Sequence, residues 1–205
     1  MRRLADFLLA LLLIAVTFPI WILVLLIVLV CSPGRPFFAH TRIGRGGKVF
    51  RLVKFRTMSS SKNGLMELTV SGDQRVTRIG RLLRRFKLDE LPQLLDILTG
   101  SMTFVGPRPE SPKYVALYTP AQREILDYLP GLTDPASLKY RFEEEILAGF
   151  SDPESGYLQT ILPDKIKLSL EYQKNRRLFS DIKIIGATFA AIFRRRVGER
   201  RLRDE

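Results

Sequence analysis

The sequence is poor in the residues that build zinc sites and cross-links, because its 205 residues include one cysteine and one histidine. A zinc centre made of Cys and His needs several such ligands, and an intrachain disulfide needs two cysteines, so both are excluded. Any bound metal must therefore be held by carboxylates, which favours Mg²⁺. A lone cysteine also fits a reducing compartment.

Acidic residues are scarce relative to basic ones. The chain has 21 Asp and Glu against 33 Lys and Arg, which gives a formal net charge of +12. Such an excess attracts polyanions, and the candidates are nucleic acid, anionic lipid and phosphorylated small molecules. The length suits one domain with one membrane element, and it is too short for two full domains with that element.

Charge is absent from the apolar stretch between Leu8 and Val30. As a straight helix this stretch would span roughly 35 Å, enough to cross a bilayer core of about 30 Å. Pro19 bends such a helix at its middle. Basic residues also flank both ends, whereas a spanning helix usually has its basic excess on the cytoplasmic side alone. A spanning helix stays open, but the pattern favours a re-entrant one that enters and leaves on the same face.

The rest of the chain predicts an α+β fold, a compact and mainly helical domain with a small β-hairpin. We expect residues 1–31 to form the re-entrant membrane helix and residues 32–205 to form a cytoplasmic, membrane-associated catalytic domain. Two strands are expected at 37–41 and 49–56, with Gly44, Gly46 and Gly47 in the turn. Helices are expected at 77–86, 89–98, 120–129 and 164–177, a loop at 59–72 and a loop-rich stretch at 133–163.

Two helix ends carry further expectations. Asp89 is a good N-cap for the helix at 89–98, and Gly100 is suited to end it. Near the C-terminus, apolar residues recur at helical spacing from Ile182 to Phe193, before the basic run 194–196. This pattern predicts an amphipathic helix in the membrane interface, with basic residues on anionic lipid headgroups. A core helix with a solvated basic tail is the alternative.

The strongest chemical signal is the pair of adjacent carboxylates, Asp89 and Glu90. At a helix start they would lie beside free backbone N–H groups, which are receptive to phosphate. One carboxylate can attack phosphorus, and the second can hold Mg²⁺ that neutralises phosphate oxygens. For the isolated motif the simpler interpretation is favoured, in which Asp89 only caps the helix and Glu90 only interacts with its dipole.

Four basic residues are candidates for phosphate binding. Arg84 precedes the carboxylates by about one and a half turns, and Arg108 lies in a loop fixed by prolines. Lys54 and Arg56 alternate along an expected strand and could share one face. For each of the four taken alone, a solvated surface charge is the competing interpretation.

Several short stretches together resemble the monotopic phosphoglycosyl transferases, also called bacterial sugar transferases. They follow one another in family order from the apolar segment to about residue 133, cover most of the chain and are jointly specific. The chain is similar to the small members of that family. The stretches are Ser32-Pro33-Gly34 with Phe37-Phe38, Arg42-Ile43-Gly44, Lys54 to Met58, Arg78-Ile79-Gly80 with Leu83-Arg84, Leu88 to Leu94, Gly100-Ser101-Met102, Val105 to Pro109 and Pro130 to Thr133.

This resemblance implies a function at the cytoplasmic face of the bacterial inner membrane. Asp89 would attack the sugar-bearing phosphate of a UDP-sugar, releasing UMP and leaving a covalent sugar phosphate. A polyprenyl (undecaprenyl) phosphate would then accept that group, as the first membrane step in making O-antigen, capsule, exopolysaccharide or glycoprotein glycan. The resemblance also implies that Glu90 and Asp89 hold Mg²⁺, and that Arg84 and Arg108 bind phosphate.

The chain departs from the family pattern at two places. Phe18 precedes Pro19 where the family often has Ser, so the hydroxyl of Thr17 is the candidate replacement. Asp134 follows the Pro130 to Thr133 stretch where many relatives have Gly, in a region that could bear on donor choice. The competing hypothesis is a non-catalytic basic module that is anchored to the membrane and binds nucleic acid or a partner. No nucleic-acid-binding signature is evident, so we expect no nucleic acid partner, and a homodimer is compatible with the sequence.

Overall fold

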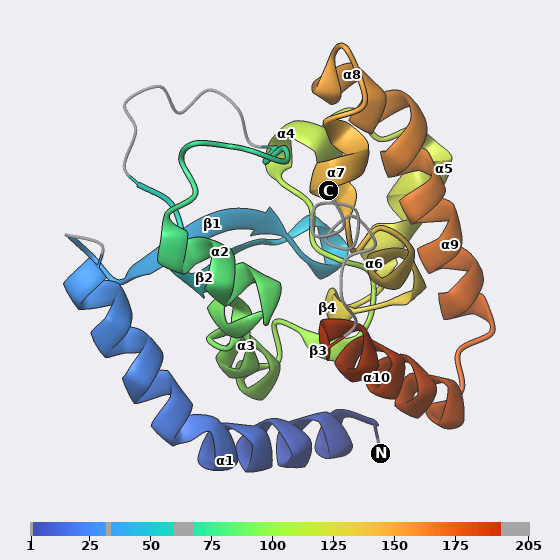
Figure 1. Cartoon of the computed structure of the whole chain (residues 1–205). Helices are drawn as coiled ribbons and strands as arrows, with labels where there is room; N and C mark the ends of the chain where they lie inside the picture. The colour runs from blue at the N-terminus through green and yellow to red at the C-terminus, as the bar shows by residue number, and fades with distance from the viewer. Residues whose placement is uncertain (1, 32–33, 60–67, 194–205) are drawn as a thin grey trace.

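The computed structural model describes residues 2–31, 34–59 and 68–193, and these are mainly helical (Figure 1). Its helices and strands confirm the α+β class with helix predominating. The α-helices are α1 (Arg2–Cys31), α2 (Arg78–Arg85), α3 (Gln93–Thr99), α4 (Pro112–Val115), α5 (Pro120–Arg123), α6 (Pro135–Lys139), α7 (Glu143–Leu147), α8 (Pro153–Gly156), α9 (Leu162–Lys174) and α10 (Leu178–Phe193). The strands are β1 (Phe37–Ile43), β2 (Val49–Phe55), β3 (Thr103–Val105) and β4 (Gly131–Thr133).

The expected hairpin is confirmed. Strands β1 and β2 pair antiparallel, in a register that runs from Phe37 opposite Phe55 to Ile43 opposite Val49. The turn contains a 3₁₀ segment, Arg45–Gly47, in which the last two glycines have φ of 69° and 74°. Residues with a side chain rarely adopt such positive φ angles, so glycine is favoured at both positions.

A second, parallel pair of strands was not predicted. Thr103 in β3 lies opposite Gly131 in β4, and Val105 lies opposite Thr133. Each strand has three residues, too few to show the alternation by which strands are identified in a sequence. This pair matters because the loop that carries Arg108 begins directly after β3.

The prediction of a helix at 89–98 capped by Asp89 is wrong at its start. Asp89 and Glu90 lie in a 3₁₀ turn, Leu88–Glu90, and α3 begins only at Gln93. The chain leaves α2 through Lys87, whose left-handed conformation (φ 56°) breaks the helical path. Asp89 is therefore not the N-cap of α3, and the acidic pair lies ahead of that helix rather than at its start. Gly100 ends α3 in the left-handed conformation, as expected.

The prediction that residues 133–163 are loop-rich is also wrong, because they contain α6, α7, α8 and a π-helix, Tyr157–Ile161. Each segment has four or five residues, too few for a helical period to be visible. Asp134 accepts a hydrogen bond from the Ser137 amide and caps α6, with its side chain buried. In the loop expected at 59–72, residues 60–67 lie outside the described residues.

The remaining expected helices are present. The basic helix at 77–86 is α2, and Thr77 caps it by accepting a hydrogen bond from the amide of Gly80. The helix expected at 120–129 begins as α5 and continues as a 3₁₀ turn, Glu124–Asp127. The helix expected at 164–177 is α9.

Helix α1 contacts the folded domain at both of its ends. Near its N-terminus, Arg3 donates hydrogen bonds to the carbonyls of Leu98 (3.0 Å) and Met102 (3.2 Å), and Asp6 accepts one from Thr103 (2.6 Å). Towards its C-terminus, its buried Val24 and Val28 pack with side chains of β2 and α2. Figure 1 shows that α1 bends along its length, and Pro19 lies within it.

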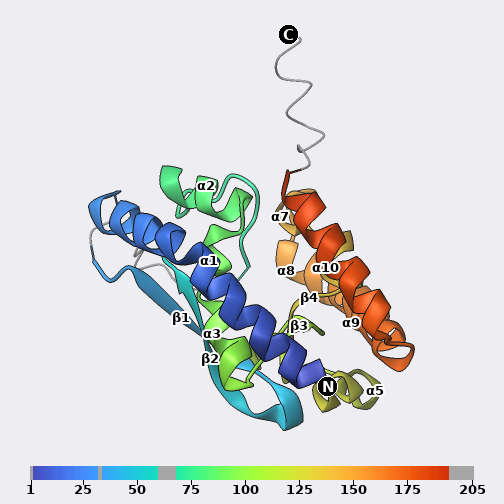
Figure 2. The same ribbon diagram turned by 90° about the horizontal axis from the view of Figure 1, so that it is seen from below.

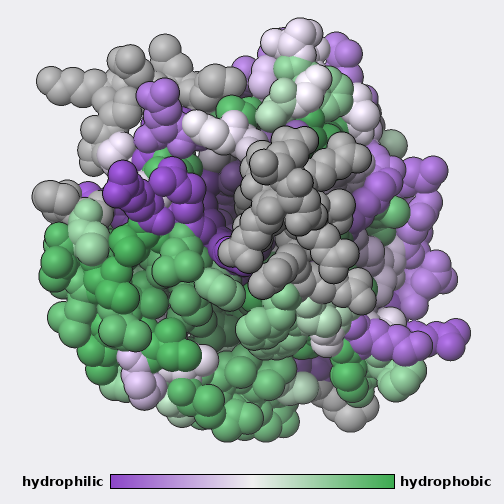
Figure 3. All heavy atoms as spheres, in the orientation of Figure 1, coloured by the Kyte–Doolittle hydropathy of each residue, from purple (hydrophilic) through white to green (hydrophobic). Residues whose placement is uncertain are grey.

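The surface formed by α1 and α10 is strongly apolar. Figure 2 shows that both helices lie on the face seen from below, and Figure 3 shows hydrophobic residues gathered over that side of the molecule. Helix α1 is long and apolar enough to cross a membrane. Helix α10 exposes large apolar side chains, while the basic run 194–196 lies outside the described residues. The exposed large apolar side chains of α10 are Leu178, Phe179, Ile182, Phe189 and Phe193.

Candidate active site

The carboxylate of Glu90 is the centre of a largely buried cluster of charges. Lys54 donates from Nζ to Oε1 of Glu90 at 2.9 Å, and Arg108 donates from Nη2 to the same oxygen. The Nζ of Lys87 lies 3.9 Å from Oε1. Arg108 also reaches Oε2 through Nη1, at 3.4 Å. Three of the surrounding cations therefore converge on Oε1, which leaves Oε2 the less engaged oxygen.

These charges keep Glu90 ionised. Burial alone would raise its pKa, but the charges of Arg108 and Lys54 outweigh burial and hold the pKa well below its ordinary value. In return, Glu90 raises the pKa of Arg108. Glu90 is thus an ionised carboxylate that is fixed between Lys54 and Arg108.

Asp89, next to Glu90, lies in a different environment. Its side chain is buried, and its Oδ1 has no hydrogen-bond partner among the described residues. Burial raises the pKa of Asp89, Lys54 opposes this change, and the negative charge of Glu90 adds to it. One carboxylate is therefore held tightly by cations, whereas its neighbour keeps a buried oxygen without a hydrogen-bond partner.

Three separate parts of the chain place these groups. Lys54 comes from β2, Asp89 and Glu90 come from the 3₁₀ turn after α2, and Arg108 comes from the loop between β3 and α4. This loop passes very close to β4, because a Cβ added to Gly131 would lie 2.1 Å from the Gly106 nitrogen. Pro107, the next residue after Gly106, restricts the backbone that leads to Arg108.

Arg84 lies at the edge of the cluster and has partners of its own. Its Nε donates to the hydroxyl of Thr57 (3.0 Å), and its Nη1 donates to Glu144 of α7 (2.9 Å). Helix α2 approaches Thr57 so closely that a Cβ on Gly80 would lie 2.0 Å from the Thr57 carbonyl oxygen. The charge of Arg84 still lowers the pKa of Asp89, as one of the smaller effects.

Arg56 is placed apart from Lys54. Its Nη1 would lie 2.7 Å from a Cβ added to Gly34, in the segment that links α1 to the hairpin. The structure therefore brings Lys54, Glu90 and Arg108 into one cluster and puts Arg84 at its edge. It sets Arg56 beside the segment that follows α1.

Sequence reasoning missed several residues around this site. Lys87 contacts Glu90, and Thr57 and Glu144 contact Arg84. His40 lies close enough to Lys54 and Arg84 for their charges to lower its pKa. Lys87 is adjacent to a motif that was identified, so its position could have suggested it. Glu144 lies far along the chain from Arg84 and carries no pattern that indicates the pairing.

The acidic pair fits a magnesium ion in its donor chemistry. Mg²⁺ is usually bound by one or two carboxylates together with substrate phosphates and water. The unpartnered Oδ1 of Asp89 and the less engaged Oε2 of Glu90 are donors of that kind. The described residues contain no group of three or more possible ligands, so the remaining ligands would come from substrate and water.

Comparisons with known proteins agree on one family. The family model described as bacterial sugar transferase matches residues 1–195. Over 195 residues the chain is 33% identical to a UDP-glucose:undecaprenyl-phosphate glucose-1-phosphate transferase of Caulobacter vibrioides, covering 93% of this chain and 69% of that protein.

Two further relatives differ in length and in the sugar or process that they are named for. A UDP-N-acetylgalactosamine-undecaprenyl-phosphate N-acetylgalactosaminephosphotransferase of Aeromonas hydrophila is 32% identical over 93% of this chain, which spans only 43% of that protein. The exopolysaccharide production protein ExoY of Sinorhizobium fredii is 30% identical over 93% of this chain and 84% of its own length.

Proposed function

The chain belongs to the bacterial sugar transferase family, and we propose that it transfers a sugar 1-phosphate from a UDP-sugar to a polyprenyl phosphate. The products are UMP and a polyprenyl diphosphate sugar, which begins a lipid-linked glycan. The observation that carries this proposal is the Asp89–Glu90 pair, in which one carboxylate is clamped by Lys54 and Arg108 and the other keeps a free oxygen.

The transfer takes place in two displacements at phosphorus. An oxygen of the Asp89 carboxylate bonds to the phosphorus that bears the sugar, while the bond from that phosphorus to the UMP oxygen breaks and UMP leaves. An oxygen of the polyprenyl phosphate then attacks the same phosphorus. The bond to Asp89 breaks, the carboxylate is restored and the diphosphate is complete.

The other residues of the cluster orient and neutralise the phosphates. Asp89 and Glu90 would hold Mg²⁺, which supplies positive charge to the phosphate oxygens and stabilises the departing UMP. Lys54 and Arg108 keep Glu90 ionised and fixed. Arg84 can turn its guanidinium from Glu144, whose side chain is 42% exposed, towards the donor diphosphate. Arg56 lies on the membrane side, where the acceptor phosphate would arrive.

The membrane arrangement follows from the contacts of α1. Its N-terminal end is hydrogen-bonded to α3 and β3, and its C-terminal end packs on β2 and α2. A helix that holds both ends against one domain returns to the face it entered, which supports the re-entrant topology. The apolar face of α10 then lies in the same interface, with anionic lipids beside the basic chain. We place the domain at the cytoplasmic face of the inner membrane.

The proposal is tested by UMP release from a panel of UDP-sugars. The purified chain is assayed with undecaprenyl phosphate and Mg²⁺, beside the Asp89→Asn variant and a surface control, Asp127→Asn. We expect UMP from at least one donor with the wild type and the control, and none with Asp89→Asn. A chain that releases no UMP from any donor but binds nucleic acid at moderate salt would favour the basic-module hypothesis instead.

A further inference from the structure

A second group of charged and polar side chains surrounds Glu110, two residues after Arg108. We call it the Glu110 network. It contains residues from four elements, and the transfer reaction described above uses none of them. Its members are Arg42, Glu110, Glu143, Tyr157 and Lys165.

Glu110 is the hub of this network. The hydroxyl of Tyr157 donates to Oε1 of Glu110 at 2.6 Å, and Nζ of Lys165 lies 3.8 Å from the same oxygen. Nη1 of Arg42 lies 3.7 Å from Oε2. Lys165 also donates to Oε2 of Glu143, at 2.9 Å. The side chains of Glu110 and Lys165 are each only 12% exposed.

The backbone of Glu110 is anchored as well. Its carbonyl oxygen accepts a hydrogen bond from the amide of Ile43, the last residue of β1, at 2.9 Å. Glu110 therefore connects the hairpin that carries Lys54 with the loop that carries Arg108. Arg108 is two residues away from this anchor and also feels the charge of Glu143, which adds to the effect of Glu90 in raising the pKa of Arg108.

Tyr157 reaches Glu110 from the π-helix that joins α8 to α9. Its side chain is 1% exposed. Burial, followed by the charge of Glu110, raises the pKa of Tyr157 well above its ordinary value, so the hydroxyl keeps its proton and donates. Segments of π-helix are rare, and they frequently occur at functional sites.

Stability alone is a weak explanation for such a network. Buried ion pairs often contribute little net stability, because desolvation of the charges offsets their attraction. Their geometry, by contrast, fixes the atoms they join. The network fixes the residue two positions beyond Arg108, and a displacement of about 1 Å in a catalytic group can cost roughly a hundredfold in rate.

We propose that Glu110 and Tyr157 are positioning residues that hold Arg108 in its bidentate contact with Glu90. This inference rests on the proposed function, since it assigns a role within the same site. Glu110 and Tyr157 touch neither substrate nor the reacting atoms. They act through the backbone of the Arg108 loop, and Lys165 and Arg42 hold the Glu110 carboxylate in place.

The test is a double-mutant cycle on the full-length chain in detergent. Tyr157→Phe removes only the hydroxyl that donates to Glu110, and Arg108→Lys removes the bidentate contact. If Tyr157 acts through Arg108, Tyr157→Phe lowers kcat about tenfold in the wild type and has almost no effect in the Arg108→Lys background. A merely structural role would give the same fold-loss in both backgrounds, and that result would overturn the proposal.

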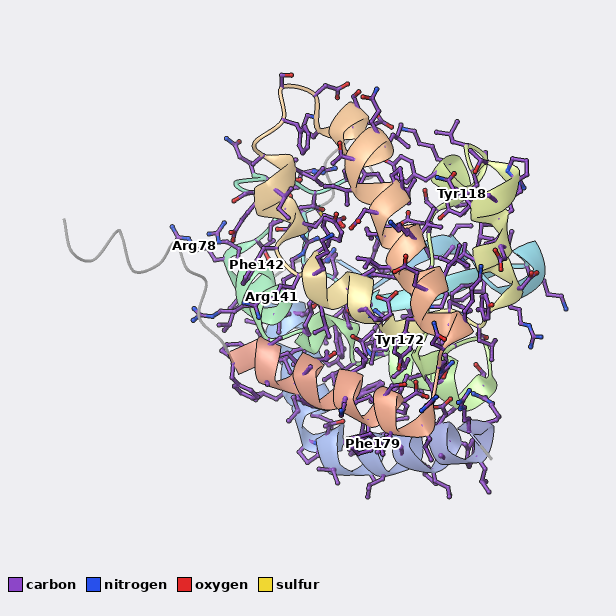
Figure 4. The ribbon with its side chains drawn as sticks, turned by 90° about the vertical axis from the view of Figure 1, so that its right-hand side faces the viewer. Arg78, Tyr118, Arg141, Phe142, Tyr172 and Phe179 are labelled. Carbon is purple, nitrogen blue, oxygen red and sulfur yellow. The ribbon has the colours of Figure 1, made fainter. Side chains whose placement is uncertain are left out.

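Tyr172→Phe is the matched control. Tyr172 is also a tyrosine whose hydroxyl donates to a carboxylate, Asp181, at 2.7 Å. Burial and then the charge of Glu110 raise the pKa of Tyr118, so Tyr118 marks the neighbourhood of the Glu110 network. Figure 4 shows Tyr172 near α10 and away from Tyr118. We expect kcat to be unchanged in Tyr172→Phe, and an equal loss there would also contradict the proposal.

Glu110→Gln replaces Tyr157→Phe in the same cycle if Tyr157→Phe fails to fold. It keeps an acceptor for Tyr157 but removes the charge that holds Arg42 and Lys165. A wild-type chain that releases no UMP contradicts the proposed function itself. An active wild type with equal losses in both backgrounds contradicts the positioning role alone.

Discussion

Arg108 binds Glu90 through two nitrogens, with Nη2 donating to Oε1 and Nη1 lying 3.4 Å from Oε2. Glu90 lies in the turn that precedes α3, and Arg108 lies in the loop that follows β3. Their pairing keeps the Glu90 carboxylate ionised in a buried place. It leaves Asp89, the neighbouring residue, as the carboxylate with an unpartnered oxygen.

Replacing Glu90 tests whether the clamped carboxylate matters for the reaction. Glu90→Gln keeps the shape of the side chain but removes the charge that Lys54 and Arg108 share. We expect UMP release to fall by roughly 10²-fold or more, because the phosphate-binding charges lose their fixed arrangement. Initial rates at saturating donor measure the effect.

A surface carboxylate is the control for that substitution. Glu124 is paired with Lys174 and its side chain is 43% exposed, so Glu124→Gln should leave the rate unchanged. If Glu90→Gln kept the wild-type rate, the clamped carboxylate would have no part in the reaction.

The bend of α1 gives a spectroscopic prediction. Thr17 donates from its hydroxyl to the carbonyl of Leu13 (2.6 Å) and accepts a hydrogen bond from the indole of Trp21 (3.2 Å). Thr17→Val removes both bonds, at a cost of about 1 kcal/mol within lipid. Because Trp21 is the sole tryptophan of the sequence, intrinsic fluorescence in vesicles reports on it directly, and we expect a shifted emission maximum.

Thr41→Val, in β1, is the control for this measurement. An emission maximum that is identical in the wild type, Thr17→Val and Thr41→Val would show that the hydroxyl does not hold Trp21. The sequence suggested Thr17 as a substitute for the family's Ser. In the structure its hydroxyl binds the carbonyl of Leu13, whereas Pro19 leaves the carbonyl of Ala15 without its helical donor.

The re-entrant topology predicts that both ends of α1 lie on one side of the membrane. Cys31, the sole cysteine, is exposed at the end of α1. A Leu4→Cys, Cys31→Ser chain carries the thiol at the other end. We expect a membrane-impermeant maleimide to label both chains in inverted vesicles and neither in intact cells stripped of their outer membrane. Labelling of the Leu4→Cys chain from outside would establish a spanning helix instead.

His40 gives a prediction on pH. Burial, together with the charges of Arg42 and Lys54, lowers its pKa to about 4. An unfolded histidine titrates near pH 6.5, so below that pH the unfolded chain takes up a proton that the folded chain refuses. Stability should therefore fall as the pH drops from about 6.5 towards 4.

Two measurements check this. His40 is the sole histidine, so one imidazole signal in an NMR titration reports its pKa, and we expect no titration between pH 5 and 8. His40→Gln should flatten the fall of the unfolding midpoint over the same range. A signal that titrates near pH 6.5 would contradict the burial and charges described for this residue.

The sequence predicted those features whose signal is local. The glycines between β1 and β2 indicated the hairpin turn, and the apolar run indicated α1. The acidic pair was identified, but its setting was wrong, because the left-handed Lys87 delays α3 to Gln93. No local pattern shows that a chain will leave a helix at a lysine.

The partners of the site residues were beyond the sequence for a different reason. Arg84 meets Glu144, and Glu110 meets Tyr157, only because short helices late in the chain fold back onto α2 and onto the loop after β3. These helices have four or five residues, too few to be identified by period. The contacts therefore depend on tertiary structure that a single sequence does not display.

The most direct test of the account is to trap the covalent sugar phosphate on Asp89. The full-length chain is mixed with its UDP-sugar and Mg²⁺ without polyprenyl phosphate, and its intact mass is measured. We predict a mass increase of one sugar phosphate together with one equivalent of UMP, absent from Asp89→Asn and reversed when undecaprenyl phosphate is added. UMP release that requires the acceptor, with no mass increase at any time, would contradict the two-step reaction.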